Sequence, residues 1–282
     1  MAEKVLIVNA DDFGLHPAIN DGIISSFEDG IVSDMSVVAC GSAFEDAVSK
    51  LLLIGKRSVG VHLTLVGERP LSSPDDIPTI VDKESGRFFA GYGSFLLRYF
   101  SGVIDVEDVR RELLLQIERV EDAGLEVTHL DTHQHLHLLP RIAEIVVSLA
   151  LEHRVRYVRV PLPEEDLPLN LRGVLFRLSR PFGRRLMRKL REANVCFADH
   201  FYGVVCGGKL DKGSLLSLLR SLPEGTSELM CHPGFKRDGV EELYPWGYMW
   251  ETEVEALTDV GVKEYIAQEG IKLSDVESAV NC

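Results

Sequence analysis

The chain has 282 residues, of which 45% are apolar, so it can bury a substantial core, and α/β barrels of this length are commonly single domains. Asp and Glu number 44 against 30 Lys and Arg, and the resulting formal charge of −14 argues against general nucleic-acid binding. No stretch is typical of a membrane span or a secretory signal, and the five cysteines are scattered, so we expect a cytoplasmic protein with reduced thiols.

Strand-like and helix-like segments alternate along the chain. The apolar run at 4–10 predicts a strand, and Pro17 is typical of the first turn of a helix that ends near Gly30. Repeated β-α units with apolar strands indicate a parallel sheet covered by helices, and their number favours an α/β barrel of the TIM type. Further strands are predicted at 35–39, 59–65, 127–135, 157–160 and 228–231, and further helices at 43–54, 105–123, 140–153, 212–222 and 251–260.

Two segments interrupt this alternation. Residues 66–104 are rich in Gly, Pro and Asp in places, and residues 161–200 also fit no β-α unit. In a barrel, insertions of this kind lie over the site or beside it. We therefore predict a single domain over residues 1–282 with insertions near 66–104 and 161–200.

The first predicted strand ends on two adjacent carboxylates, Asp11 and Asp12. Two like charges side by side repel each other. The pair therefore needs either a cation, or a division of roles in which one carboxylate binds and the other takes protons. In a parallel α/β barrel the reactive groups gather at the C-terminal ends of the strands, and this pair lies at such an end.

Histidines and a further Asp follow other predicted strands in the same way. Between residues 129 and 137 a His or Asp stands at every second position, and because strand side chains alternate, we expect all of them on one side. A lone histidine at a strand end is more often a core residue, but burying this many polar groups without an organising charge is costly. The pattern predicts a catalytic divalent metal held by one carboxylate and two imidazoles; Zn²⁺ fits the imidazoles best, and Mg²⁺ or Mn²⁺ stay open. The residues concerned are His62, Asp131, His133, His135, His137 and His232.

Four strings carry a resemblance to a known family. In order and spacing they resemble the YdjC/ChbG carbohydrate deacetylase family over nearly the whole chain. The resemblance implies a distorted (β/α) barrel that removes acetyl from N-acetylated amino sugars with one divalent ion. It implies Asp12, His62 and His133 as metal ligands and Asp11 as the catalytic base. The strings are Val8-Asn9-Ala10-Asp11-Asp12-Phe13-Gly14, Gly60-Val61-His62-Leu63, His129-Leu130-Asp131-Thr132-His133-Gln134-His135-Leu136-His137 and Cys231-His232-Pro233-Gly234.

Further polar residues have roles with open alternatives. We predict that His232 is the general acid for the departing amine, or else a histidine that tethers backbone. His135 is an alternative ligand to His133, because histidines at i and i+2 can chelate one ion. Otherwise His135 and His137 orient a ligand or substrate hydroxyls, and Asp131 lies just beyond the ligands.

The substrate is the least defined part of the prediction. The stretches 15–18 and 77–88 look closest to the hopanoid-biosynthesis-associated (HpnK-like) branch, which implies an N-acetylglucosaminyl lipid, whereas the family at large implies a chitooligosaccharide-like substrate. His200 is expected in the sugar pocket or in an ordinary loop. Trp246 is expected either to stack on a sugar ring or to pack in the protein.

Residues 171–191 form a basic segment, with seven arginines and Lys189 interleaved with apolar residues and no acid. Such a segment can rest on an anionic membrane surface, as a peripheral contact. A solvated helix pair broken at Pro181–Gly183, with one apolar face on the barrel, explains it as well. So does the acidic face of a second subunit in a homodimer.

Three functions therefore compete. The first is a metal-dependent N-deacetylase of an amino sugar, either free or lipid-linked. The second is another metal hydrolase on the same barrel, acting on a phosphoester or a cyclic amide; against the phosphoester, the polar cluster holds no Arg or Lys to neutralise a phosphate. The third is a non-catalytic sugar-binding protein, for which loss of Asp11 or of a ligand would be the sign, and all of them are present.

Overall fold

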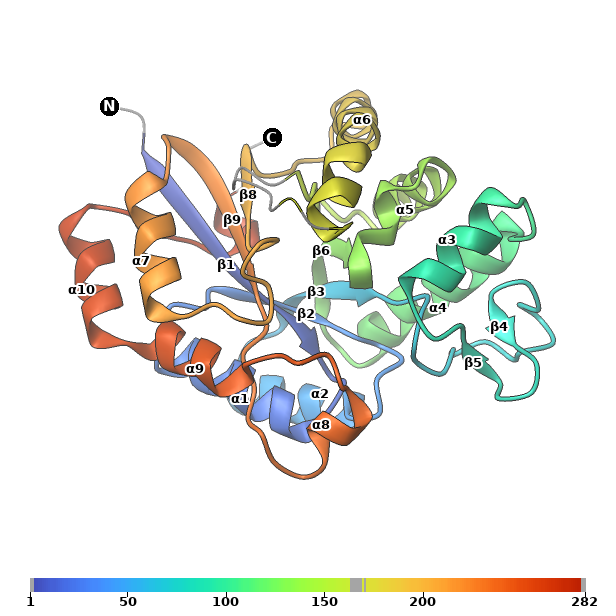
Figure 1. The fold of residues 1–282 in the computed structure, drawn as a ribbon, viewed down its shortest axis with the longest axis horizontal. Helices are drawn as coiled ribbons and strands as arrows, with labels where there is room; N and C mark the ends of the chain where they lie inside the picture. The colour runs from blue at the N-terminus through green and yellow to red at the C-terminus, as the bar shows by residue number, and fades with distance from the viewer. Residues whose placement is uncertain (1–2, 163–168, 170, 280–282) are drawn as a thin grey trace.

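The computed structural model describes residues 3–162, 169 and 171–279, and its main feature is one curled sheet with helices around it (Figure 1). The strand order is β7-β6-β3-β2-β1-β9-β8, with β10 beside β1, and each of these pairings is parallel. The predicted α/β barrel of parallel strands is confirmed, in a distorted form. The strands are β1 (Lys4–Phe13), β2 (Asp34–Val37), β3 (Ser58–Leu63), β6 (Glu126–Thr132), β7 (Tyr157–Val158), β8 (His200–Tyr202), β9 (Gly225–Cys231) and β10 (Lys272–Leu273).

The two ends of this strand order approach each other where β7 meets the segment that leads into β8. Tyr157 in β7 forms an isolated parallel bridge with Cys196, and the Val158 amide donates to the Cys196 carbonyl at 3.0 Å. Within the described residues, the ring is thus joined here by a bridge and not by a long ladder. Cys196 is disulfide-bonded, so the prediction of reduced thiols is wrong at this position. Three other cysteines are free: Cys40, Cys206 and Cys231.

The helices pack their apolar faces on the sheet. In α4, Asp105 caps the first turn by accepting a hydrogen bond from the Glu107 amide at 3.0 Å. Its predicted apolar face, with Val109, Leu113 and Ile117, is fully buried. The longer helices are α1 (Pro17–Glu28), α2 (Phe44–Leu53), α4 (Val106–Asp122), α5 (Pro140–Glu152), α7 (Lys212–Ser221), α9 (Trp250–Thr258) and α10 (Val260–Gln268), and the short ones are α8 (Val240–Leu243) and α11 (Val276–Ala279).

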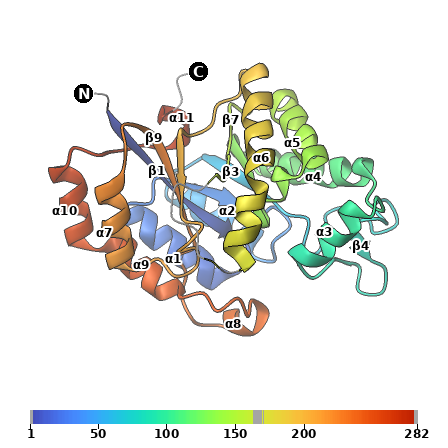
Figure 2. The same cartoon turned by 45° about the horizontal axis from the view of Figure 1, so that its top comes forward.

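Both predicted insertions contain helices. The first holds the hairpin of β4 (Val81–Asp82) and β5 (Arg87–Phe88), followed by α3 (Tyr92–Phe100). The second holds α6 (Leu171–Glu192), which lies alongside α5 (Figure 2). The predicted break at Pro181–Gly183 is wrong, because α6 runs through Pro181 as one helix. Among the described residues, no helix has the length and apolar character that crossing a bilayer requires.

The segment that was predicted as a strand over 127–135 changes conformation before its end. β6 stops at Thr132, and His133–Leu138 form a 3₁₀ turn, η1, in which Gln134 and His135 have positive φ values of 58° and 55°. The Thr132 hydroxyl accepts a hydrogen bond from the His137 amide at 3.1 Å and so stabilises this turn. The prediction that the histidines of this segment share one strand face is therefore wrong.

Candidate active site

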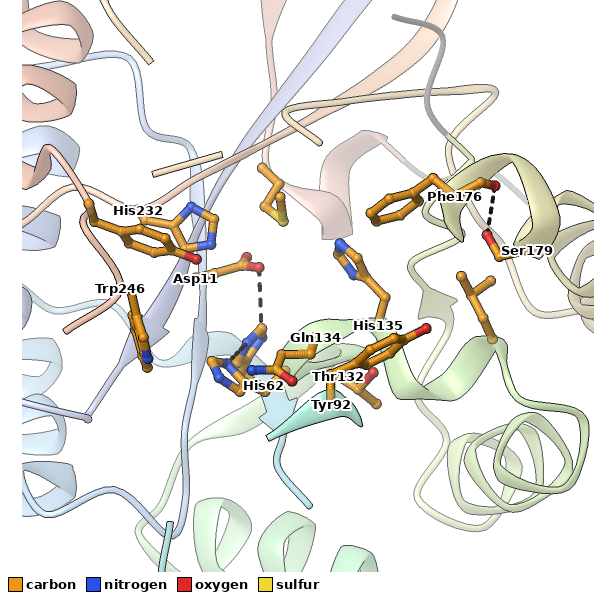
Figure 3. A pocket seen from close by; sticks show the side chains of 14 residues that line it. Asp11, His62, Tyr92, Thr132, Gln134, His135, Phe176, Ser179, His232 and Trp246 are labelled. Atoms are coloured by element: carbon orange, nitrogen blue, oxygen red, sulfur yellow. Dashed lines mark hydrogen bonds and ion pairs between the residues drawn. The ribbon is translucent and has the colours of Figure 1, made fainter. Parts of the chain in front are cut away.

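A pocket of about 490 Å³ opens where the sheet strands end (Figure 3). In Figure 3, Asp11, His62, His232 and Trp246 lie at one end of it, and Phe176 and Ser179 of α6 lie at the other. The first end holds most of the ionisable groups, and the second is largely apolar. The lining comes from strand ends, from η1 and from both insertions: Asp11, His62, Tyr92, Thr132, His133, Gln134, His135, Leu138, Phe176, Ser179, Met230, His232, Trp246 and Tyr248.

Three side chains form a triangle of ligand atoms beside this pocket. His133 Nδ1 lies 3.1 Å from Asp12 Oδ1 and 3.3 Å from His62 Nε2, and His62 Nε2 lies 3.5 Å from Asp12 Oδ1. Atoms that share a four-coordinate ion with bonds of about 2.0–2.1 Å lie about 3.4 Å apart. The spacing of the three atoms therefore fits a divalent cation.

Two further observations agree with a cation at this triangle. Asp12 Oδ2 is buried and has no hydrogen-bond partner among the described residues, although an unpaired carboxylate oxygen is costly to bury. Burial by itself would lower the pKa of His62, but Asp131 and Asp11 beside it raise that pKa to about 9. The surroundings of His62 thus favour a positive charge, which a bound cation would supply.

The tautomer of His62 also follows from its contacts. Its Nδ1 lies 2.8 Å from Asp131 Oδ1. A neutral imidazole that donates from Nδ1 to this carboxylate keeps the lone pair of Nε2 for a metal. Asp131 therefore fixes the orientation of the His62 ring from just beyond the triangle.

Asp11 is held by a buried arginine, Arg159. The guanidinium donates from Nη1 to Asp11 Oδ2 at 2.6 Å and from Nη2 to Asp11 Oδ1 at 2.7 Å. Burial would raise the pKa of Asp11, but the positive charges of Arg159 and His62 and the hydrogen bonds from Arg159 hold it well below its usual range. Asp11 is therefore an ionised carboxylate with a fixed orientation.

Arg159 joins three strands and was missed by the sequence reasoning. Besides Asp11, it contacts Asp131 Oδ2 at 2.7 Å through Nη1 and donates from Nε to Glu228 Oε1 at 2.6 Å. Glu228 also accepts from the Tyr157 hydroxyl at 2.5 Å. In the sequence, the sign of its importance was that it is the single charged residue within the predicted strand 157–160. The polar cluster thus contains one arginine, whose charge is matched by carboxylates.

His232 follows β9 and lines the same end of the pocket as Asp11 and His62. Its backbone amide donates to Glu253 Oε2 at 2.6 Å, and its ring lies edge-on to Tyr248 with a centroid distance of 5.0 Å. Its Nδ1 is buried without a hydrogen-bond partner in the described part of the chain. Burial lowers the pKa of His232, so the neutral imidazole faces the pocket at neutral pH.

Helix α1 supports the turn that carries His232. A Cβ atom built on Gly22 would lie 2.3 Å from the Cα atom of Gly234, so only glycine allows this approach of the two backbones. The position of His232 therefore depends on the close packing of Gly22 in α1 against Gly234.

His135 and Trp246 both line the pocket. The group of ligand atoms that lie within 4.8 Å of one another includes His133 and not His135. His135 instead makes edge contacts with Phe176 and Phe201, and its Nδ1 is buried without a partner among the described residues. The indole of Trp246 lies 5.5 Å from the His133 ring. The geometry therefore favours His133 over His135 as the ligand.

Two other predicted residues do not reach the pocket. Both ring nitrogens of His137 are engaged, Nδ1 at 2.6 Å from Thr132 Oγ1 and Nε2 at 2.9 Å from the Arg159 carbonyl. His137 thus fixes the backbone of Arg159. His200 is the first residue of β8, opposite Ser227 of β9, and Ser227 precedes His232 by five positions. Neither is among the lining residues, because His137 turns away in η1 and His200 lies too early in its strand.

The chain is similar to known proteins over nearly its whole length. A family model described as YdjC-like protein matches residues 5–268. A carbohydrate deacetylase of Thermoanaerobacter pseudethanolicus is 29% identical over 272 residues, which cover 96% of this chain and 98% of that protein. A chitooligosaccharide deacetylase of Salmonella paratyphi B is 28% identical over 276 residues, with coverages of 96% and 97%. A crystal structure from Enterococcus faecalis, of a protein proposed to cleave cellobiose phosphate, superposes with a TM-score of 0.80 at 26% identity, with coverages of 99% and 100%.

Proposed function

Because the chain belongs to the YdjC-like protein family, we propose that it is a metal-dependent N-deacetylase, which hydrolyses the N-acetyl amide of an acetylated amino sugar. The observation that carries this proposal is the triangle of Asp12, His62 and His133, with the oriented carboxylate of Asp11 in the same pocket. The deacetylase names of the two relatives support a sugar amide as the substrate.

The triangle of Asp12, His62 and His133 would hold one divalent ion, Zn²⁺ or Mg²⁺. When bound, such an ion supplies Lewis-acid chemistry: it polarises the acetyl carbonyl and makes water more acidic. Asp131 keeps His62 in the tautomer that ligation needs.

Asp11 and His232 would move the proton. Asp11 accepts a proton from the attacking water, and because Arg159 keeps its pKa low, it does not retain that proton. His232 enters the reaction neutral, takes up the proton that Asp11 gives up, and as the imidazolium delivers it to the amine nitrogen while the carbon–nitrogen bond breaks. One proton thus passes from water to the departing amine, and both residues return to their starting forms.

The remaining lining would bind the sugar. Trp246 and Tyr248, whose ring centroids are 5.3 Å apart, offer aromatic faces to a sugar ring beside the reactive end. The apolar end, with Leu138 and Phe176, has room for a second sugar or for an apolar aglycone. The substrate would therefore be a chitooligosaccharide-like sugar or an N-acetylglucosaminyl lipid of the hopanoid type.

The buried Arg159 does not make the site suited to a phosphoester substrate. The Arg159 side chain is 0% exposed and pairs with Asp11, Asp131 and Glu228. Its charge is therefore already matched by carboxylates and does not face the pocket.

Acetate release from N-acetylglucosamine, from diacetylchitobiose and from an N-acetylglucosaminyl lipid, each with and without EDTA, tests the proposal. We expect acetate from at least one of these substrates, and its loss in EDTA. Release of acetate that EDTA does not affect, or none from any substrate with added Zn²⁺ or Mg²⁺, would contradict it. Binding of a sugar without acetate release would instead favour the non-catalytic sugar-binding protein.

A further inference from the structure

The outer face of α6 carries a stripe of arginines on a protein whose formal charge is −14. The helix contains eight Lys and Arg residues and one acid, Glu192. Arg180, Arg184 and Arg188 follow one another at intervals of four, so they lie along one side of the helix, and all three are exposed. We call these three residues the arginine stripe.

The stripe is not neutralised by the acids around it. Arg185 and Lys189 share Glu144, each at 3.1 Å. In the described part of the chain, no ion pair joins an acid to Arg180, Arg184 or Arg188. Three positive charges therefore face solvent in a row.

The opposite side of α6 is anchored in the protein. Leu186 and Leu190 are fully buried, and a Cβ atom on Gly183 would lie 2.4 Å from the Leu162 side chain. Because this inner face cannot rotate outward without losing its packing, the stripe has a fixed direction.

Apolar side chains are exposed on the first half of the same helix. Val174 is 43% exposed and Leu178 is 66% exposed. Their neighbours on the helix, Phe176 and Ser179, line the pocket. The exposed apolar side chains of Val174 and Leu178 thus lie beside residues that line the pocket, on the same helix as the arginine stripe.

We propose that α6 docks the protein on an anionic lipid surface. The arginine stripe would contact lipid phosphates, and Val174 and Leu178 would enter the boundary between headgroups and acyl chains. Elsewhere the negative charge of the protein opposes such a surface, so attraction at α6 would also orient the molecule, with its pocket close to the lipid.

The exposed leucine and valine favour lipid over the alternatives. A nucleic acid or an acidic protein face would pair with the arginines but would leave Leu178 without a matching apolar partner. This proposal does not depend on the reaction, because binding to vesicles needs no turnover.

Co-sedimentation of the full chain with vesicles tests the proposal. We expect binding to phosphatidylcholine vesicles that contain one-third phosphatidylserine, no binding to pure phosphatidylcholine, and release at high salt. The triple variant Arg180→Gln, Arg184→Gln, Arg188→Gln should lower the partition coefficient on the order of 100-fold, since each cation near such a surface contributes about fivefold. Leu178→Ser should weaken the binding that remains at intermediate salt.

A control variant removes the same charge elsewhere, at the exposed residues Lys83, Arg156 and Lys209. This variant, with each residue changed to Gln, should bind vesicles like the original chain, and its thermal melting should match that of the stripe variant. The proposal is overturned if the original chain does not bind anionic vesicles, or if stripe and control variants bind equally. A dimer that the stripe variant dissociates, without any vesicle binding, would also overturn it.

Discussion

Arg159 and Asp11 form a bidentate ion pair that is almost completely shielded from solvent, with two parallel hydrogen bonds of 2.6 and 2.7 Å. The pair fixes both oxygens of Asp11, so the carboxylate has one orientation toward the pocket. Glu228 fixes the guanidinium in turn through Nε. We therefore expect Asp11 to act as a base without having to reorganise during the reaction.

The first prediction concerns Arg159. Arg159→Lys keeps a positive charge but loses the parallel pair of hydrogen bonds, so Asp11 should rotate away from its present orientation. We expect kcat to fall about 100-fold, as for a misplaced catalytic group. Metal content, measured by mass spectrometry, should stay unchanged.

Glu228→Gln is the matched variant for this experiment, because it retains an acceptor for Nε of Arg159. It should lose less activity than Arg159→Lys. If Arg159→Lys lost its metal, Arg159 would act on the metal site and not on the orientation of Asp11.

The second prediction separates the two adjacent carboxylates. Asp11→Asn should lower kcat by about 10²- to 10⁴-fold, as removal of a general base does, and should leave the metal content intact. Asp12→Asn should lose the metal, since one anionic ligand becomes neutral. Asn tolerates the left-handed backbone at position 12, where φ is 69°, so this variant should fold. The reverse outcome, with an empty site in Asp11→Asn, would exchange the two roles.

The third prediction decides between two histidines. A divalent ion that binds only the folded chain raises its stability, by about 2.7 kcal/mol at a concentration 100 times the dissociation constant. His133→Ala should remove the rise in melting temperature on addition of Zn²⁺, and His62→Ala should do the same. His135→Ala should keep it, because its ring lies among Phe176 and Phe201. A lost response in His135→Ala alone would make His135 the ligand.

The fourth prediction tests the packing behind His232. Gly22→Ala forces the backbone of Gly234 away from α1, which should cost about 1–3 kcal/mol of unfolding free energy and lower kcat together with it. Gly93→Ala in α3 is the control, because a Cβ there meets nothing within 4 Å. It should leave activity unchanged and stability equal or slightly higher. Equal melting temperatures for the two variants, measured by calorimetry, would show that the turn tolerates the displacement.

Local patterns predicted the parts of the site that lie on regular strands. The apolar run before Asp11 and Asp12 indicates a buried strand, and β1 carries both residues at its end. The string around His62 belongs to β3, and only β2 separates this strand from β1 in the sheet. In such segments the side-chain direction follows from the backbone period, so sequence reasoning succeeds.

Sequence reasoning failed where distant residues decide the backbone or the charge. The alternation of His and Asp suggested a strand through His135, yet the Thr132 hydroxyl ends it by bonding to the His137 amide and ring. Arg159 owes its importance to Asp11, 148 positions away in the sequence. The local hydrophobic pattern of a segment cannot predict that three carboxylates from other strands will contact one side chain.

The single bridge between Tyr157 and Cys196 has a consequence for how the barrel could diversify. A barrel wall joined by a continuous ladder fixes the backbone hydrogen bonds along both of its edges, whereas an isolated bridge fixes them at one point only. The long insertion that carries α6 lies between those two sides. An insertion of another sequence at this place would therefore disturb few backbone hydrogen bonds of the wall, while Arg159, two residues from Tyr157, would keep its contact with Asp11.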